Sequence, residues 1–491
     1  MQQPNLPNLD EPDSVPEKSR RILPIIVGCA LLMQMLDATV VTTALPTMAR
    51  ELGSNPIEMN LAITSYLIST AVFVPISGWA ADRYGARKIF IAAIVLFSLS
   101  SLTCALSQTL TQLVISRIVQ GLGGAMMVPV GRIILLRSIP KHELIKAMAL
   151  LSMPALIGPM AGPPLGGFLV TYASWHWIFL INIPIGFLGI WMVLKHVREL
   201  PSDGLTHRLD FWGFILSALC MACLVSGFEM LGNGGSSARS SLFLIALGLI
   251  AGWGYTIHAR RHAEPILNLA LLKIQTFRIA MFAGNLCRFS IGATPYLLAL
   301  LLQVGFGMSA LAAGLITFAG AVGSLAMKVA APRILNRWGY RRVLTINAIF
   351  TGLSLMICAS FTQETPGLVM MAILLLGGFF RSLQFTAVNT LTYADINQTD
   401  MSRASSFAAM GQQLGISLGV GVAAETVSLS MSWRGAQTVD PQDVLIGFLV
   451  IGTLCALAAL SFWRLSSTAG ASLRAKSVSY THLTLPTKRI E

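Results

Sequence analysis

The segment GWAADRYGARK (residues 78–88) gathers four charged side chains in a chain that is otherwise poor in charge. Of the 491 residues, 54% are hydrophobic and 11% are charged, whereas about a quarter of the residues of a soluble domain are charged. Apolar runs of about 20 residues, long enough to cross a bilayer as a helix, lie on both sides of this segment. The sequence therefore predicts an all-α polytopic membrane protein in which the charged part of this segment connects two transmembrane helices.

The apolar runs predict about fourteen transmembrane helices and an orientation for the chain. Loops on one side carry about eighteen Lys and Arg residues, and loops on the other side carry three. Because positively charged loops stay in the cytoplasm, both termini are predicted to be cytoplasmic. The net charge of +13 follows from these loops, so no nucleic-acid partner is expected. The predicted spans are 22–45, 60–80, 89–107, 112–136, 144–171, 177–195, 211–230, 241–259, 279–302, 309–331, 342–361, 367–390, 404–428 and 444–464.

The loop sequence occurs twice. DRYGARK (82–88) returns as NRWGYRR (336–342), ~254 residues later, and each copy follows the second span of a block of six. Two parallel blocks of this kind are a transporter architecture. The predicted divisions are an N-terminal tail (1–21), an N-terminal six-helix bundle (22–195), a linker with two extra helices and an interfacial segment (196–278), a C-terminal six-helix bundle (279–464) and a C-terminal tail (465–491), of which the polar stretch 477–491 is predicted to be non-native.

Several segments resemble one known family. GWAADRYGARK resembles the loop between helices 2 and 3 of the major facilitator superfamily. LDATVVTTALP (36–46), LVISRIVQGLGGA (113–125) and GPMAGPPLGG (158–167) resemble the first-, fourth- and fifth-helix motifs of its fourteen-spanner drug:proton antiporters. SWHWIFLINIPIG (174–186) also fits that family, as does LDFWG at 209–213. The resemblance covers roughly residues 22–464 and implies the major facilitator fold, with two six-helix bundles plus two extra helices.

In the resembling family, the repeated loop is a conformational latch between the two halves. Gly78 allows close helix approach, Gly85 permits a turn with positive φ, and Asp82 can accept hydrogen bonds from an Arg. Asn336 replaces this aspartate in the second copy, so that copy is expected to be weaker. The predicted latch residues are Gly78, Asp82, Arg83, Gly85, Arg87, Asn336, Arg337 and Gly339.

Two charges inside predicted spans are candidates for proton coupling. Asp37 lies in the middle of the first span, where a charged carboxylate is energetically costly. Because a proton removes this charge, Asp37 is a candidate proton carrier. Arg117 cannot lose its proton, but it can stabilise a nearby carboxylate, and the resemblance links it to proton coupling. The structural alternative is that Asp37 is only a partner for a nearby arginine or hydroxyl, and that Arg117 only holds a backbone carbonyl.

The fifth predicted span carries an unusual number of glycines and prolines. Small residues allow close packing, and prolines remove backbone hydrogen bonds and bend a helix. An ordinary close-packed, kinked helix is the structural alternative to a helix that takes part in alternating access. The candidate residues of this antiporter helix are Gly158, Pro159, Gly162, Pro163, Gly166 and Gly167.

Further intramembrane charges predict a substrate cavity. Arg288, Arg381 and Glu425 lie within spans of the second block and are candidates for the lining of this cavity. The two arginines could bind an anionic substrate, and the alternative is that they pair only with backbone carbonyls. Arg132, late in the fourth span, is expected to extend to the cytoplasmic interface.

The sequence favours a transporter over an enzyme. It lacks a Walker A loop, and the histidines (His142, His176, His196, His207, His258 and His262) show no metal spacing, so neither ATP nor a metal or other cofactor is expected. We predict a proton-driven monomeric exporter, with small molecules and protons as partners, that moves drugs or other amphipathic compounds by alternating access. An exporter of an anionic metabolite or metal chelate is the alternative, followed by an importer and by a non-transporting membrane sensor.

Overall fold

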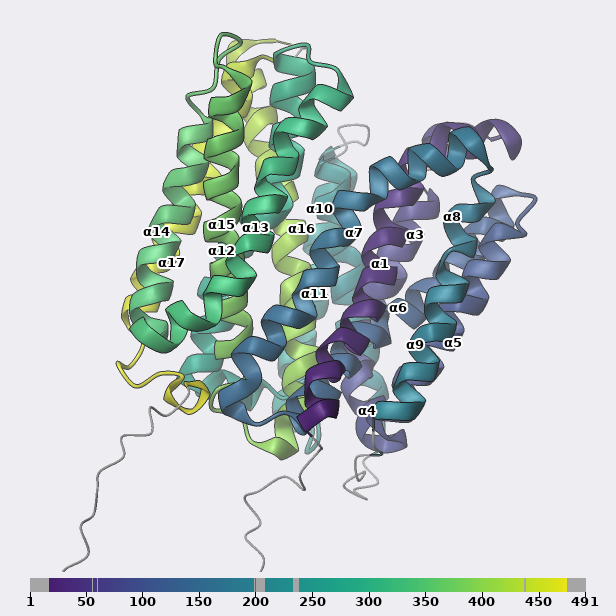
Figure 1. Ribbon diagram of the computed structural model, residues 1–491, viewed down its shortest axis with the longest axis vertical. Helices are drawn as coiled ribbons and strands as arrows, with labels where there is room; N and C mark the ends of the chain where they lie inside the picture. Colours follow the sequence, from purple (N-terminus) through teal and green to yellow (C-terminus); the bar gives the residue numbers. More distant parts are fainter. Residues whose placement is uncertain are drawn as a thin grey trace, which may run out of the picture.

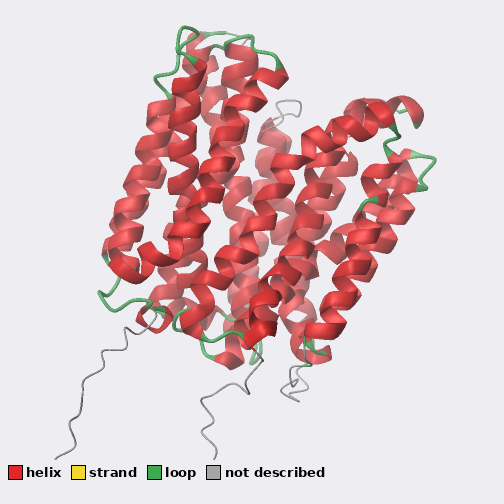
Figure 2. Ribbon diagram, in the orientation of Figure 1, coloured by secondary structure: helices red, strands yellow, loops and turns green. Residues whose placement is uncertain are grey.

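The computed structural model describes residues 17–54, 56–59, 61–197, 199, 208–232, 238–436 and 439–474. Within these ranges every regular element is a helix, and Figure 2 shows long helices joined by short loops. The predicted all-α fold is therefore confirmed. The predicted non-native stretch 477–491 lies outside the described residues.

The first part of the chain contains six long helical segments. The second of these is composite, because α3, a turn of 3-10 helix and α4 together form one continuous span from residue 61 to residue 84. The elements are α1 (Glu17–Glu51), α2 (Pro56–Met59), α3 (Leu61–Phe73), η1 (Val74–Ile76), α4 (Ser77–Tyr84), α5 (Ala86–Ala105), α6 (Leu110–Ser138), η2 (Lys141–Glu143), α7 (Leu144–Tyr172), α8 (His176–Leu180) and α9 (Asn182–His196).

The rest of the chain contributes eight long helices. The elements are α10 (Phe211–Gly232), α11 (Ala238–Arg261), η3 (Leu269–Lys273), α12 (Gln275–Ala299) continued by η4 (Leu300–Gly305), α13 (Ala310–Trp338), α14 (Tyr340–Cys358), α15 (Gly367–Leu391), η5 (Gln398–Asp400), α16 (Met401–Arg434), α17 (Pro441–Trp463) and η6 (Ala471–Leu473).

Thirteen helices of the described residues are long and apolar enough to cross a membrane, and each matches a predicted span to within seven residues at either end. The remaining predicted span, 144–171, corresponds to α7, a helix of 29 residues. At 1.5 Å per residue such a helix is about 43 Å long, which exceeds the thickness of a hydrocarbon core.

The long helices pack in two groups with a bridge between them (Figure 1). In the first group α1 lies along α7, and both α3 and α5 pack on α6. In the second group α13 lies along α15, α14 along α17, and α12 along α16. The bridging helix α10 packs on α3 of the first group and α16 of the second, with α11 against its other side.

The two groups are joined by hydrogen bonds toward the end of the molecule from which the described termini leave. There the hydroxyls of Ser77 and Ser406 lie 2.9 Å apart, and Ser405 donates to the carbonyl oxygen of Pro129 at 3.0 Å. Lys141 also donates to the carbonyl oxygen of Ala394 at 3.1 Å. Figure 1 shows the two groups of helices diverging toward the opposite end.

Two glycines make the sharp joints between neighbouring helices. Gly85 (φ +89°) separates α4 from α5, and Gly339 (φ +73°) separates α13 from α14. Other residues are strained in this left-handed region, so glycine is the residue that these joints require. The positive φ predicted for Gly85 is confirmed, and its counterpart in the second copy shares it.

The interfacial segment predicted within the linker corresponds to residues 264–273, which pack against α11. Ile266, Leu267 and Leu271 are buried, and the Tyr255 hydroxyl of α11 bonds to both backbone groups of Leu267, donating at 2.9 Å and accepting at 2.8 Å. The segment is therefore held by protein contacts in addition to any contact with lipid.

Candidate functional site

Asp37 lies on α1 and forms an ion pair with Arg117 of α6. One guanidinium nitrogen is 2.5 Å from Oδ2 of the carboxylate, and neither side chain has more than 1% of its surface exposed. An ion pair that has lost its hydration is maintained only when its remaining donors and acceptors are satisfied. Both charges lie within helices that are long and apolar enough to cross a membrane.

Neighbouring amides and hydroxyls complete the coordination of this ion pair. The side-chain nitrogen of Gln120 donates to Oδ1 of Asp37 at 2.9 Å and to Ser101 at 2.7 Å. Asn182 donates to the same carboxylate oxygen at 3.3 Å. The carboxylate on α1 therefore contacts α6 and α9 directly and α5 through the amides that also bond to Ser101.

Arg117 makes further contacts with α3. Its Nε donates to the carbonyl oxygen of Ala62 at 3.0 Å, and its guanidinium lies 4.4 Å from the centre of the Tyr66 ring. A guanidinium over an aromatic face gains electrostatic stabilisation from the ring. The two residues that the sequence selected for proton coupling are thus brought together, although they are 80 positions apart.

Asp82, at the end of α4, links both groups of helices. Its Oδ1 accepts a hydrogen bond from Arg137 of α6 at 2.9 Å and from Ser402 of α16 at 2.6 Å. Arg137 also donates to Ser402 at 3.1 Å. One aspartate therefore holds an arginine from its own group and a hydroxyl from the opposite group.

Gly78 brings α4 against α16 at the same place. A Cβ atom built at this glycine would stand 2.6 Å from both the carbonyl oxygen of Ser402 and the hydroxyl of Ser406. Any larger residue would push the two helices apart. This contact explains why glycine occupies the position, and it lies one helical turn from Asp82.

The basic residues of the first loop copy have different surroundings. Arg87 donates to the carbonyl oxygen of Leu194 at 2.9 Å and lies 3.9 Å from the Glu199 carboxylate. Both partners belong to the first group or to the residues just after it. Arg83 is exposed and does not join these contacts. Of the latch candidates in this copy, Gly78 and Asp82 contact the opposite group directly.

Among the described residues, the second loop copy makes no equivalent side-chain bridge. The Asn336 side-chain oxygen is buried and has no hydrogen-bond partner among the described residues. Its backbone oxygen instead accepts two hydrogen bonds from Arg474, at 3.0 and 2.7 Å. Arg337 is exposed, and Gly339 provides the turn.

Three glycines of α7 form the surface against which α1 packs. A Cβ atom at Gly158 would stand 2.6 Å from Met35, and Cβ atoms at Gly162 and Gly166 would overlap the hydroxyls of Thr39 and Thr43, respectively. Gly167 faces away, because a Cβ added there would meet no atom within 4 Å. Pro159 and Pro163 lie in the same helix, and their side chains are outside the described residues. The close packing places α1, the helix that carries Asp37, directly against α7.

Arg288 of α12 and Arg381 of α15 line one pocket. Arg288 is buried and donates to Asn285 and to Asn389, both at 2.9 Å. Neither arginine has a carboxylate within 4 Å among the described residues. Glu425, the third cavity candidate, does not join them, because its side chain is exposed on α16. Two of the three residues thus share a site.

Lys328 and Arg132 are two further buried basic side chains, and Lys328 was not identified from the sequence. Lys328 is buried on α13, donates to Thr386 at 2.8 Å and lies 5.3 Å from the centre of the Phe385 ring. Its position inside the predicted span 309–331 was the signal that could have identified it. Arg132 is 6% exposed, and its guanidinium donates to Gln412 of α16 at 3.2 Å.

Comparison with known proteins agrees with this architecture. The model of the Major Facilitator Superfamily matches residues 27–257 and 280–486. The chain belongs to the major facilitator superfamily. Members are transporters, so this chain is a membrane transporter and not an enzyme.

Curated relatives in this superfamily carry the name "Putative multidrug resistance protein MdtD". The protein of Enterobacter sp. (strain 638) is 39% identical over 447 residues, covering 89% of this chain and 93% of its own. That of Serratia proteamaculans (strain 568) is 40% identical over 449 residues, covering 89% and 92%. The Escherichia coli O6:H1 protein is 41% identical over 400 residues, covering 81% and 84%.

Solved structures of the superfamily share the fold at low sequence identity. The human organic anion transporter MFSD10 (TETRAN) superimposes with a TM-score of 0.63 at 16% identity, covering 90% of this chain and 99% of its own. The proton:xylose symporter XylE gives a TM-score of 0.64 at 16% identity, covering 92% and 97%. These likenesses support the fold of this chain.

Proposed function

We propose that this transporter is a proton-coupled exporter of drugs or other small amphipathic compounds. It acts across the bacterial inner membrane by alternating access, as a monomer with both termini in the cytoplasm. Protons and substrate exchange in opposite directions, and no ATP or other cofactor takes part. The name of the bacterial relatives supports multidrug compounds as the substrate class.

The observation that carries this proposal is the buried pair of Asp37 and Arg117. A carboxylate in an apolar protein interior is the group best suited to accept a proton, because protonation removes its desolvated charge. Arg117 holds the charged form until a proton arrives. Protonation of Asp37 then weakens its attraction to α6 and leaves the guanidinium to Gln120, Ala62 and the Tyr66 ring.

The contacts between the groups suggest how this change is transmitted. Asp82, Ser402 and Arg137 close the end that carries the termini, which in the proposed orientation is the cytoplasmic side. The structure then corresponds to an outward-facing state. Return to the inward-facing state requires these bonds to break, while α1 moves against the glycine surface of α7.

Everted membrane vesicles containing the protein test this function. Addition of lipophilic cationic drugs should release protons from energised vesicles, as reported by a pH-sensitive dye. The Asp37→Asn variant, shown to be folded and inserted, should give no release. Proton release at the wild-type rate in this variant would exclude Asp37 as the coupling group.

A second candidate function, export of an anionic metabolite or metal chelate, is favoured by four basic side chains within the membrane-spanning helices. Arg132, Arg288, Arg381 and Lys328 have no carboxylate within 4 Å among the described residues, and two of them share a pocket. A positive charge inside a membrane protein is costly unless an anion neutralises it, and the carboxylate of a substrate is one such anion.

The same vesicles distinguish the two substrate classes. Citrate-like anions and their metal chelates form a second panel beside the cationic drugs. Arg381→Gln should abolish a response to anions and spare a response to cations, whereas Arg342→Gln, an exposed control on α14, should affect neither. Loss of the cation response in Arg381→Gln would contradict this assignment.

A further inference from the structure

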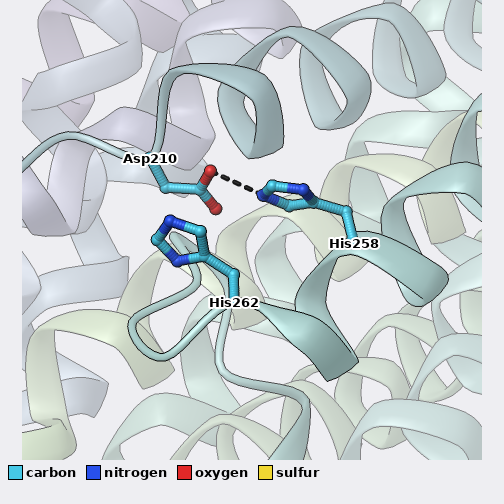
Figure 3. A group of neighbouring side chains, drawn as sticks. All are labelled: Asp210, His258 and His262. Carbon is cyan, nitrogen blue, oxygen red and sulfur yellow. Dashed lines mark hydrogen bonds and ion pairs between the residues drawn. The ribbon is translucent and has the colours of Figure 1, made fainter.

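Asp210, His258 and His262 form a cluster at the joint between α10 and α11 (Figure 3). Asp210 immediately precedes α10, His258 lies in the last turn of α11, and His262 follows that helix by one residue. One ligand-type atom from each residue lies within 4.8 Å of the other two. The histidines are four positions apart, a spacing that places two side chains on one face of a helix.

The carboxylate also has a structural role. Its Oδ1 accepts hydrogen bonds from the Gly213 amide at 2.9 Å and from Nε2 of His258 at 2.7 Å. Its Oδ2 receives one long bond, 3.3 Å, from the Ile266 amide. A carboxylate offers about four acceptor positions. Asp210 therefore caps α10 and can still bind another partner.

Capping does not account for His262. Its ring lies nearly parallel to that of His258, with centres 5.2 Å apart and planes at 29°, beside the buried carboxylate. Two protonated imidazoles at this separation would repel each other, whereas two neutral imidazoles and a carboxylate can share one cation. This combination of nitrogen and oxygen ligands suits zinc and other divalent first-row ions.

The surrounding charges permit a cation. The adjoining pocket is lined by equal numbers of acidic and basic residues: Asp82, Asp210 and Glu264 with Arg83, Arg208 and Arg403. His262 is exposed, so an ion can enter from solvent. The pocket also contains Asp82, which bonds to Ser402 of the opposite group.

We propose that Asp210, His258 and His262 bind a divalent first-row transition metal ion such as Zn²⁺. Small rotations of the exposed His262 bring the three ligand atoms to bonding distance, and water completes the coordination. The ion replaces the proton that lies between His258 and Asp210, which moves to Nδ1 or to solvent. If His262 ligates through Nε2, its proton moves to Nδ1 and the 3.2 Å bond from the Glu264 amide is lost.

Such an ion would fasten the first turn of α10 to the end of α11 and the chain that follows. Because α10 packs on both groups of helices, the site lies where it can stiffen the bridge between them. This inference does not depend on which substrate the transporter carries or on proton coupling.

The test is direct metal binding to the purified full-length protein, isolated through an affinity tag without histidine. Titration calorimetry with Zn²⁺ should show one saturable site per chain, and Co²⁺ should give the visible absorption of a nitrogen- and oxygen-ligated ion. Zn²⁺ should also raise the midpoint of thermal unfolding.

Matched variants assign the ligands. His262→Gln keeps the bonds between Asp210 and His258, so it should fold normally yet weaken Zn²⁺ binding by at least about tenfold. His142→Gln removes another exposed histidine beside a carboxylate, Glu143 at 3.8 Å, and should bind as the wild type does. Absence of a saturable site, or equal affinity in His262→Gln, would overturn the proposal and leave Asp210 as a helix cap alone.

Discussion

At the scale of single residues, the ion pair of Asp37 and Arg117 defines the proposed mechanism. Both charged side chains are buried, so they are stabilised by each other and by the hydrogen bonds of Gln120 and Asn182, which also bond to Ser101. The sequence identified both charged residues, because a charge inside an apolar span is conspicuous. It did not identify the amides and hydroxyls, since such polar residues are common in spans and only their convergence gives them a role.

The dependence of each charge on the other predicts a non-additive effect on stability. Arg117→Met should lower the free energy of unfolding by about 3–5 kcal/mol, because it leaves Asp37 charged and unpaired. The double variant Asp37→Asn/Arg117→Met should lose clearly less than the sum of the single changes. Thermal unfolding in detergent measures this, and additive losses would show that the residues do not interact.

At the scale of elements, the helices were the most predictable feature. Apolar length decides where a membrane-spanning helix lies, so the predicted spans agree with the observed helices to within seven residues at either end. Which helices pack against one another was less predictable. The glycine pattern of α7 indicated close packing but not its partner, and the contact with α1 depends on the folded arrangement.

The packing of α1 on α7 predicts a contrast between two glycines of α7. Gly162→Ala places a Cβ against Thr39 and should destabilise the protein by about 1–3 kcal/mol and slow transport. Gly167→Ala meets no atom and should be neutral or slightly stabilising. Thermal unfolding and transport rates of the two variants test this, and equal behaviour would argue against the packing surface.

At the scale of the whole molecule, the two groups of helices are joined mainly at one end. The repeated loop was visible in the sequence, but its two copies contribute differently. Asp82 accepts a hydrogen bond from Ser402 of the opposite group. The backbone oxygen of Asn336 instead accepts a hydrogen bond from Arg474, in the tail that follows the second group. The sequence showed the substitution, and the structure shows which contact each copy makes.

The cluster of Asp210 with two histidines could not be predicted from the sequence, because Asp210 lies 48 positions from His258 and only the fold brings them together.

The unequal loops predict unequal effects on conformation. Asp82→Ala should open the end that carries the termini and expose Ser405, which is fully buried on α16. In a background without the seven native cysteines, a Ser405→Cys probe should therefore react faster with a thiol reagent. Asn336→Ala is the matched control and should leave the labelling rate unchanged. Equal acceleration by both changes would contradict the assignment of the bridge to Asp82.

The central claim is that protonation of Asp37 couples the proton gradient to substrate movement. Purified protein in liposomes tests it most directly, with an imposed pH gradient and a labelled substrate. The wild type should accumulate substrate above equilibrium, whereas Asp37→Asn should exchange substrate across the membrane without accumulating it. Accumulation by Asp37→Asn to the wild-type level would contradict the account, because the gradient would then act without this carboxylate.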